Sequence, residues 1–306
     1  MTFRYSDDNK RYHTLNYHNK HTYGGRVVKA VIDAGLTCPN IDGSKSCGGC
    51  IFCDGGSGYF TAEPTVTITE QLRCETERIR AKYPDALINA YFQAHTNTYA
   101  DIRTLERMFR EAINCGVHSI SIATRSDCID RDKILLIKSL GIPVTVELGV
   151  QTVHDETAAI LNSCLCFSVH LDAIHLLKER GVRTCVHIIN GLPGETGEMM
   201  LETARLLGKE CPEGVKIHLL HVIRGTRLHE MYDNGEYRPM DKDKYIETTS
   251  RQLEYFPQET VVERLTGDGD KSKLIAPMWS TDKISVLGGI DKYMADNDIC
   301  QGDKYE

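Results

Sequence analysis

Six short apolar runs, each rich in β-branched residues, alternate with helical stretches between residues 27 and 222. The runs predict strands at 27–33, 87–92, 119–123, 144–148, 184–189 and 215–222. Strands that alternate with helices form a parallel sheet, because each helix carries the chain back to the edge where the strand began. The same order fits an incomplete (β/α)6 barrel and an open doubly wound sheet, and in both the ligand lies at the carboxyl ends of the strands.

The loop after the first strand is rich in glycine and holds four of the twelve cysteines of the chain. Thiolates bind zinc and iron–sulfur clusters, and the two residues between Cys50 and Cys53 allow both thiols to reach one metal centre. Spacing alone leaves the third ligand open, because Cys38 precedes this pair and Cys47 forms a ferredoxin-like run with it. All four thiols together would suit a zinc site. The sequence therefore predicts a metal-binding loop at the ligand end of the sheet.

The sequence motif of this loop is similar to that of a known family. It reads Cys-Pro-Asn-Ile-Asp-Gly, a spacer, and then Gly-Gly-Cys-Ile-Phe-Cys. This resembles the YhcC/YtqA-like subgroup of the radical S-adenosylmethionine (SAM) superfamily, with Ile41 where that subgroup usually has arginine. The resemblance extends from Tyr12 to Tyr293.

The resemblance implies a fold and a set of cofactors. The fold is α/β, an incomplete (β/α)6 TIM-like barrel with a C-terminal α/β extension. The cofactors are a [4Fe–4S] cluster, held by Cys38, Cys50 and Cys53, and SAM bound at the open iron. In ferredoxin runs a proline follows the last cysteine, whereas here Pro39 follows the first. We therefore take Cys38 rather than Cys47 as the third ligand.

Three segments are expected along the chain. A basic N-terminal segment covers residues 1–25, and the radical SAM core covers 26–240. Residues 241–306 change character and predict a helix near 241–255 and a strand near 260–265. We interpret this last segment as an extension that caps the barrel.

The strand ends supply the residues that the resemblance assigns to cofactor binding. The aromatic residue between the last two cysteines matches the ring that lies beside the adenine, and the other residues follow strands two to five. The set is Phe52, Gln93, Asn97, Arg125, Asp127, Glu147, Gln151, Ile188, Gly191 and Pro193.

Two of these residues are also predicted to be catalytic. Arg125 suits a carboxylate because its planar fork makes paired hydrogen bonds, and Asp127 can orient it. Glu147 ends a β run, and an unpaired carboxylate is costly to bury, so we expect a ribose hydroxyl, the SAM ammonium or Arg125 as its partner. His218 and His221 should fall on opposite faces of the sixth strand, and neither is assigned a role.

Composition limits the cellular compartment and the binding partners that we expect. The first residues lack a secretory apolar stretch and no run reaches the ~20 apolar residues of a membrane span, so we expect a cytoplasmic protein with reduced thiols. The net charge of −7 does not attract nucleic acid as a whole. Residues 1–30, however, carry six cations against two aspartates, interleaved with four tyrosines. This composition fits an RNA-facing surface and equally a tail that packs on the domain.

The predicted function is that of a radical SAM enzyme that receives its electron from a flavodoxin- or ferredoxin-type reductant. The ends of strands three and four also resemble the radical SAM domain of the Elongator catalytic subunit. Together with the basic segment, this suggests tRNA as the partner and the wobble uridine as the target, on the way from carboxymethylaminomethyl to methylaminomethyl. The alternatives are radical chemistry on a small metabolite or peptide, and a cysteine-rich metal-binding protein without catalytic activity.

Overall fold

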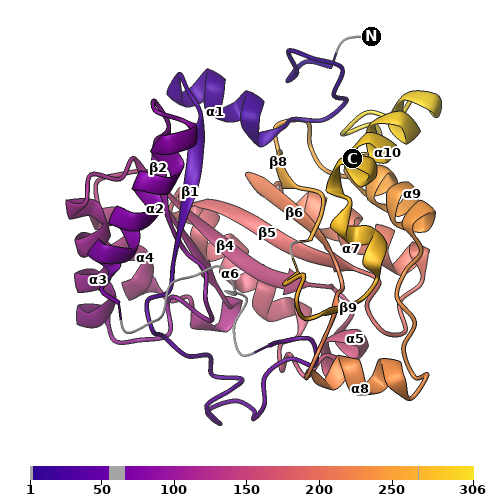
Figure 1. The fold of residues 1–306 in the computed structure, drawn as a ribbon, viewed down its shortest axis with the longest axis horizontal. Helices are drawn as coiled ribbons and strands as arrows, with labels where there is room; N and C mark the ends of the chain where they lie inside the picture. The colour runs from indigo at the N-terminus through magenta and orange to yellow at the C-terminus, as the bar shows by residue number, and fades with distance from the viewer. Residues whose placement is uncertain (1–2, 55–65, 268) are drawn as a thin grey trace.

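Seven parallel strands form one curved sheet in the computed structural model, which describes residues 3–54, 66–267 and 269–306 (Figure 1). The strand order follows the chain, β1-β2-β3-β4-β5-β6-β8, so the sheet curls in one direction instead of reversing as a doubly wound sheet does. The predicted α/β incomplete barrel is therefore confirmed. The strands are β1 (Val27–Ile32), β2 (Leu87–Phe92), β3 (Ser119–Thr124), β4 (Val144–Gln151), β5 (Arg183–Asn190), β6 (Gly214–Leu219) and β8 (Val261–Arg264).

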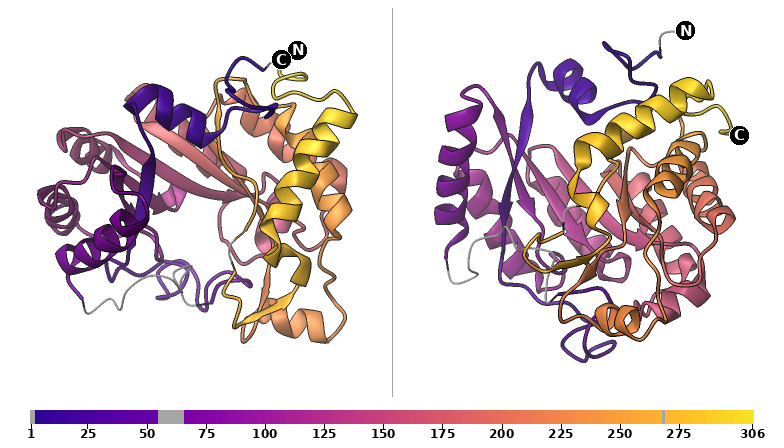
Figure 2. Two further views of the ribbon diagram at one scale, coloured as in Figure 1. Left: turned by 45° about the horizontal axis from the view of Figure 1, so that its top comes forward. Right: turned by 45° about the vertical axis from the view of Figure 1, so that its right-hand side comes forward.

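Helices cover the outer face of this sheet and leave its inner face to the site (Figure 2). Most of them begin with a side chain that caps the helix, such as Thr67, Asp101 and Thr196. The helices are α1 (Leu15–Tyr23), α2 (Ile68–Lys82), α3 (Ile102–Asn114), α4 (Arg131–Ser139), α5 (Asp155–Ile160), α6 (Phe167–Glu179), α7 (Gly197–Lys209), α8 (Arg227–Asp233), α9 (Lys242–Leu253) and α10 (Lys283–Asp296). Short 3-10 turns lie at η1 (Ser126–Cys128) and η2 (Met278–Thr281). Among the described residues no helix is both long and apolar enough to cross a bilayer.

Alternation along each strand separates an apolar outer face from a polar inner face. In β4, Val146 and Leu148 belong to the main apolar core, whereas Glu147 between them faces the interior of the barrel. In β6, Val215 and Ile217 belong to the same core, and Lys216 lies on the inner face. Successive side chains of a strand point to opposite faces, so the same pattern that builds the core also places charges inside.

The C-terminal part extends the same sheet. β8 pairs in parallel with β6, and α9 and α10 lie side by side next to it. The predicted strand and helix of this part are both present. The long sixth strand was predicted incorrectly, because β6 ends at Leu219 and a separate strand β7 (Val222–Ile223) pairs antiparallel with β9 (Leu274–Ala276).

The N-terminal segment packs on the barrel. The amide of Val262 donates to the carbonyl of His13 (2.8 Å), and the amide of Gln301 donates to that of Arg11 (3.0 Å). Lys10 forms an ion pair with Asp291 of α10. Of the two interpretations of this segment, these contacts favour the packed tail.

Candidate active site

Three of the four loop cysteines line one cavity. Cys38, Cys50 and Cys53 border a cavity of about 370 Å³ at the carboxyl ends of the strands, whereas Cys47 is exposed and does not border it. The loop turns sharply through the left-handed backbone of Gly48 and Gly49, at φ 81° and 74°, which glycine adopts without strain. This placement favours Cys38 over Cys47 as the third ligand, which stays a prediction.

A second loop, directly after α5, holds the cysteine loop in place. The side-chain amide of Asn162 donates to the carbonyl of Gly49 (2.8 Å), and its side-chain oxygen accepts from Ser46 (3.3 Å). The main-chain carbonyl of Asn162 accepts from the buried Asn40 side chain (2.6 Å). Sequence reasoning missed Asn162, although asparagine just after a helix is typical of the left-handed conformation that it adopts here, at φ 57°.

The thiols lie close enough to influence one another. Burial raises the pKa of Cys50 to about 12, and the neighbouring Cys53 and Cys38 add to the shift. In the described part of the chain, no three histidine, cysteine or acidic residues converge as the ligands of a single ion would. A [4Fe–4S] cluster has no such requirement, because each thiolate binds a different iron. Three cysteines at one cavity are a donor set that a [4Fe–4S] cluster takes.

Five of the residues predicted from the strand ends border the same cavity. They are Phe52, Gln93, Arg125, Glu147 and Gln151. Gln151 has a left-handed backbone, at φ 64°, where the pairing of β4 with β5 shifts register. Residues from four separate segments, namely the cysteine loop, the ends of β2 and β3, and β4, therefore meet at one place.

Arg125 is held rigidly at the edge of the cavity. Its Nε and Nη2 donate to the two carboxylate oxygens of Asp127 (3.0 and 3.1 Å), and Nη1 donates to the carbonyl of Ser163 (3.0 Å). Asp127 thus orients Arg125, as its position two residues further on suggested. The paired geometry fixes the plane of the guanidinium.

Besides Asp127, which acts through Arg125, four predicted residues do not border the cavity. Asn97 is fully buried and its side chain donates to main-chain carbonyls, including that of Ala94 (2.9 Å). Ile188 lies in the apolar core on the outer face of β5, and its neighbour Ile189 borders the cavity instead. The remaining two are Gly191 and Pro193, in the turn after β5.

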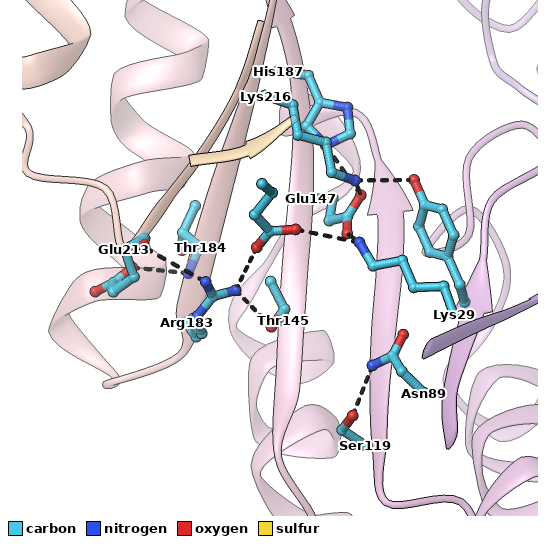
Figure 3. Close-up of polar contacts among 12 residues, drawn as sticks. Lys29, Asn89, Ser119, Thr145, Glu147, Arg183, Thr184, His187, Glu213 and Lys216 are labelled. Atoms are coloured by element: carbon cyan, nitrogen blue, oxygen red, sulfur yellow. Dashed lines mark hydrogen bonds and ion pairs between the residues drawn. The ribbon is translucent and has the colours of Figure 1, made fainter. Parts of the chain in front are cut away.

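A buried ionic network lies on the inner face of the sheet, where Glu147 and Lys216 also border the cavity (Figure 3). Glu147 lies between two lysines, Lys29 of β1 at 2.5 Å and Lys216 of β6. Lys29 also contacts Glu263 (3.2 Å), which pairs with Arg183 (2.8 Å). Arg125, one of the partners expected for Glu147, pairs with Asp127 instead, because the curved sheet brings β1 and β6 to Glu147. A contact of Glu147 with SAM stays a prediction.

The two lysines keep Glu147 ionised. Burial alone would raise the pKa of this carboxyl, but the adjacent Lys216 and Lys29 outweigh burial and hold the pKa well below its ordinary value. The side chain of Glu147 is 0% exposed and that of Lys216 is 3% exposed. Neither lysine was predicted, although alternation with Val215 and Ile217 marks Lys216 as inward-facing.

Two imidazoles lie above this network. The rings of His187 and His218 stack with their centroids 5.5 Å apart, and both border the cavity. His187 Nε2 lies 3.0 Å from a carboxylate oxygen of Glu147 without the alignment of a hydrogen bond. His221 borders the cavity as well, so the expectation that His218 and His221 face opposite sides was wrong. The reason is that β6 ends before His221 and alternation no longer applies.

Comparisons with known proteins identify the class. The family model "Radical SAM superfamily" matches residues 47–207, and "Radical_SAM C-terminal domain" matches residues 212–296. The chain therefore belongs to the radical SAM superfamily, whose members are enzymes that bind a [4Fe–4S] cluster and SAM. It is not a metal-binding protein without catalytic activity.

Individual relatives narrow the position within this family. The chain is 41% identical to the uncharacterized protein YtqA of Bacillus subtilis over 304 residues, which cover 98% of this chain and 94% of that protein. It is 25% identical to the tRNA uridine(34) acetyltransferase of Methanocaldococcus jannaschii, over 81% of this chain and 52% of that protein. The solved structure of the archaeal Methanocaldococcus infernus Elp3 has the same fold, with a TM-score of 0.69 at 19% identity, and covers 90% of this chain and 64% of that one. These similarities support the YhcC/YtqA-like subgroup, which is related to Elongator.

Proposed function

We propose that this enzyme acts on the wobble uridine of tRNA and processes its carboxymethylaminomethyl side chain toward methylaminomethyl. The observation that carries the proposal is the similarity to a tRNA uridine(34) acetyltransferase along four fifths of the chain. That relative is named for uridine 34 of tRNA, the wobble position. The site of the reaction is the cysteine-lined cavity, and we propose that the enzyme works in the cytoplasm.

Different residues of the chain bind different parts of the cofactors. Cys38, Cys50 and Cys53 would hold the cluster, and Phe52 would contact the adenine of SAM. Arg125, fixed by Asp127, binds a carboxylate of the bound cofactor. When bound, the cluster and SAM would supply radical chemistry on the substrate, with the electron from a flavodoxin- or ferredoxin-type reductant.

Glu147 and the apolar wall exclude water and fix the geometry of the cavity. The ionised Glu147 holds Lys216 at the bottom of the cavity, and Ile189, Leu219 and Leu220 border it. A dry and rigid pocket protects a reactive intermediate from side reactions. The remaining predicted residues that border the cavity, Gln93 and Gln151, present amide groups to the cofactor.

The basic segment offers fewer charges to RNA than its composition suggests. Lys10 pairs with Asp291, Arg11 with Asp298 (2.8 Å), and Lys20 with Asp7 (2.7 Å). The pairs of Lys10 and Arg11 also fasten the segment to the C-terminal part. A test by charge reversal must therefore separate the loss of packing from the loss of an RNA contact.

The proposal is tested first by profiling tRNA nucleosides from a deletion strain, which should accumulate the unprocessed wobble-uridine side chain. In vitro, tRNA should bind with an affinity that falls steeply as salt rises. Lys10→Glu should weaken binding, whereas Asp291→Asn, which breaks the same ion pair but removes a negative charge, should not. A wild-type nucleoside profile together with no tRNA binding at low salt refutes the proposal.

The second candidate is radical chemistry on a small metabolite or peptide. The net charge of −7 and the internal pairing of the basic segment favour it. Loss of a metabolite product in the deletion strain, with unchanged tRNA nucleosides, would support this candidate.

A further inference from the structure

We propose that the floor of the cavity is an anion subsite that takes a carboxylate of the substrate. The floor consists of Lys216, His187 and His218 on the inner faces of β5 and β6, where Lys216 pairs in register with His187. It lies on the strands themselves, whereas Arg125 and the cysteines follow the strand ends. This inference rests on the proposed function only in taking the substrate into this cavity.

The first argument is charge. The buried network beneath the floor contains three cations, Lys29, Arg183 and Lys216, and two carboxylates, Glu147 and Glu263. Each of these side chains is at most 23% exposed, so water screens them poorly. An uncompensated charge out of water is costly, and a counter-ion lowers that cost. Arg264 also borders the cavity and adds a positive charge near Lys216, so the floor favours an anionic group.

The second argument is the supply of hydrogen-bond donors. Lys216 has three ammonium protons, of which one points to Glu147 and one to the hydroxyl of Tyr91 (3.4 Å). The ammonium also lies over the ring of Tyr91, 4.9 Å from its centroid, but makes no further hydrogen bond among residues 3–54, 66–267 and 269–306, so one proton remains for a ligand. The ammonium therefore acts as an anchor that is already held in position.

The imidazole of His218 adds an uncharged hydrogen-bond donor. Its Nε2 atom has no hydrogen-bond partner within the described chain, whereas Nε2 of His187 lies 3.0 Å from a carboxylate oxygen of Glu147. Burial, with Lys216 next in importance, lowers the pKa of His187 to about 4, and burial followed by Arg264 lowers that of His218 well below its ordinary value. Both rings are neutral at physiological pH, and a neutral imidazole donates one N–H to a carboxylate.

The third argument is shape. Ile189, Leu219 and Leu220 give the cavity an apolar wall beside the charged floor, and the volume is about 370 Å³. Small-molecule sites commonly combine apolar walls with a few placed polar groups. The arrangement suits a short aliphatic arm that ends in a carboxylate.

The inference is tested with [1-13C]acetate, titrated into the cluster-loaded protein at an ionic strength fixed with chloride. Acetamide, which has the same shape without the charge, is the matched probe. We expect saturable broadening of the acetate line and none for acetamide. No saturable acetate binding by the wild-type protein overturns the inference, whatever the tRNA nucleoside profile shows.

Variants locate the binding site. His218→Leu should weaken acetate binding roughly ten- to a hundredfold, as expected for losing a hydrogen bond to a charged group. His175→Leu is the matched control, because that imidazole is exposed on α6 against Glu210, and its acetate affinity should equal wild type. If His218→Leu does not fold, His218→Phe, which keeps a ring without a donor, provides the same test. Unchanged acetate affinity in the folded variant overturns the inference.

Two further titrations distinguish a substrate carboxylate from the carboxylate of SAM and from phosphate. With saturating SAM present, acetate should still bind, because the floor is distinct from the cofactor site. Loss of acetate binding in the presence of SAM would assign the floor to the carboxylate of SAM and overturn the substrate assignment. Inorganic phosphate that binds more tightly than acetate would overturn the choice of a carboxylate.

Discussion

The contact between Asn162 and the cysteine loop predicts that a residue far from the thiols in sequence controls cluster retention. Asn162→Gly removes two side-chain hydrogen bonds, to Gly49 and Ser46, and a longer one to the carbonyl of Cys47 (3.4 Å), but tolerates the left-handed backbone at φ 57°. At ~0.5–1.5 kcal/mol for each of the first two bonds, the ordered loop loses at least ~1–3 kcal/mol. Asn162→Ala loses the same bonds and must also hold a left-handed backbone, which costs about 1 kcal/mol more.

The assay is the release of iron from anaerobically loaded protein to a chelator. A loss of ~1–3 kcal/mol corresponds to roughly five- to a hundredfold in the equilibrium between ordered and open loop. We expect faster release from Asn162→Gly and the fastest from Asn162→Ala. Asn297→Gly is the control, because that side chain also donates to a main-chain carbonyl (2.9 Å, Tyr293) at the end of a helix remote from the cluster. Wild-type iron retention in both Asn162 variants would refute the argument.

Two other predictions concern the arginine at the cavity edge and acid stability. Arg125→Lys loses the paired contact with Asp127, so SAM should bind roughly ten- to a hundredfold more weakly. The assay is calorimetry on protein with full iron content. Unchanged SAM affinity would show that Arg125 has only a structural role. Burial lowers the pKa of His170 to about 4 from an ordinary 6.5, so the unfolded chain binds a proton more readily between these values and stability falls as the pH drops from 6.5 to 4. In urea unfolding, His170→Gln should reduce this loss of stability by up to ~3 kcal/mol. If the free energy of unfolding falls by the same amount between pH 6.5 and 4 in the variant and the wild type, the argument about His170 is wrong.

The strands and the cofactor loop could be predicted because their causes are local. Alternation of apolar and polar residues fixes which face of β4 enters the core, and it placed Glu147 inside. The cysteines and Arg125 follow strand ends, and parallel strands bring their carboxyl ends to one side. The α/β barrel and the group of residues at its mouth therefore follow from short stretches of sequence.

The partners of these residues depend on curvature, which short stretches do not encode. Glu147 meets Lys29 and Lys216 only because the sheet curls β1 and β6 toward β4. Asn162 reaches Gly49 across more than a hundred residues, through a loop whose conformation depends on the end of α5. His221 was misplaced because the sequence does not show where β6 ends.

The central claim is that Cys38, Cys50 and Cys53 bind a [4Fe–4S] cluster that takes SAM. The most direct test is electron paramagnetic resonance of anaerobically prepared and reduced protein, with and without SAM, in the wild type and in two variants. We predict a [4Fe–4S]+ signal that changes when SAM is added, is lost in Cys38→Ala and persists in Cys47→Ala. A colourless protein with stoichiometric zinc, or a signal that survives in Cys38→Ala and disappears in Cys47→Ala, would contradict the assignment.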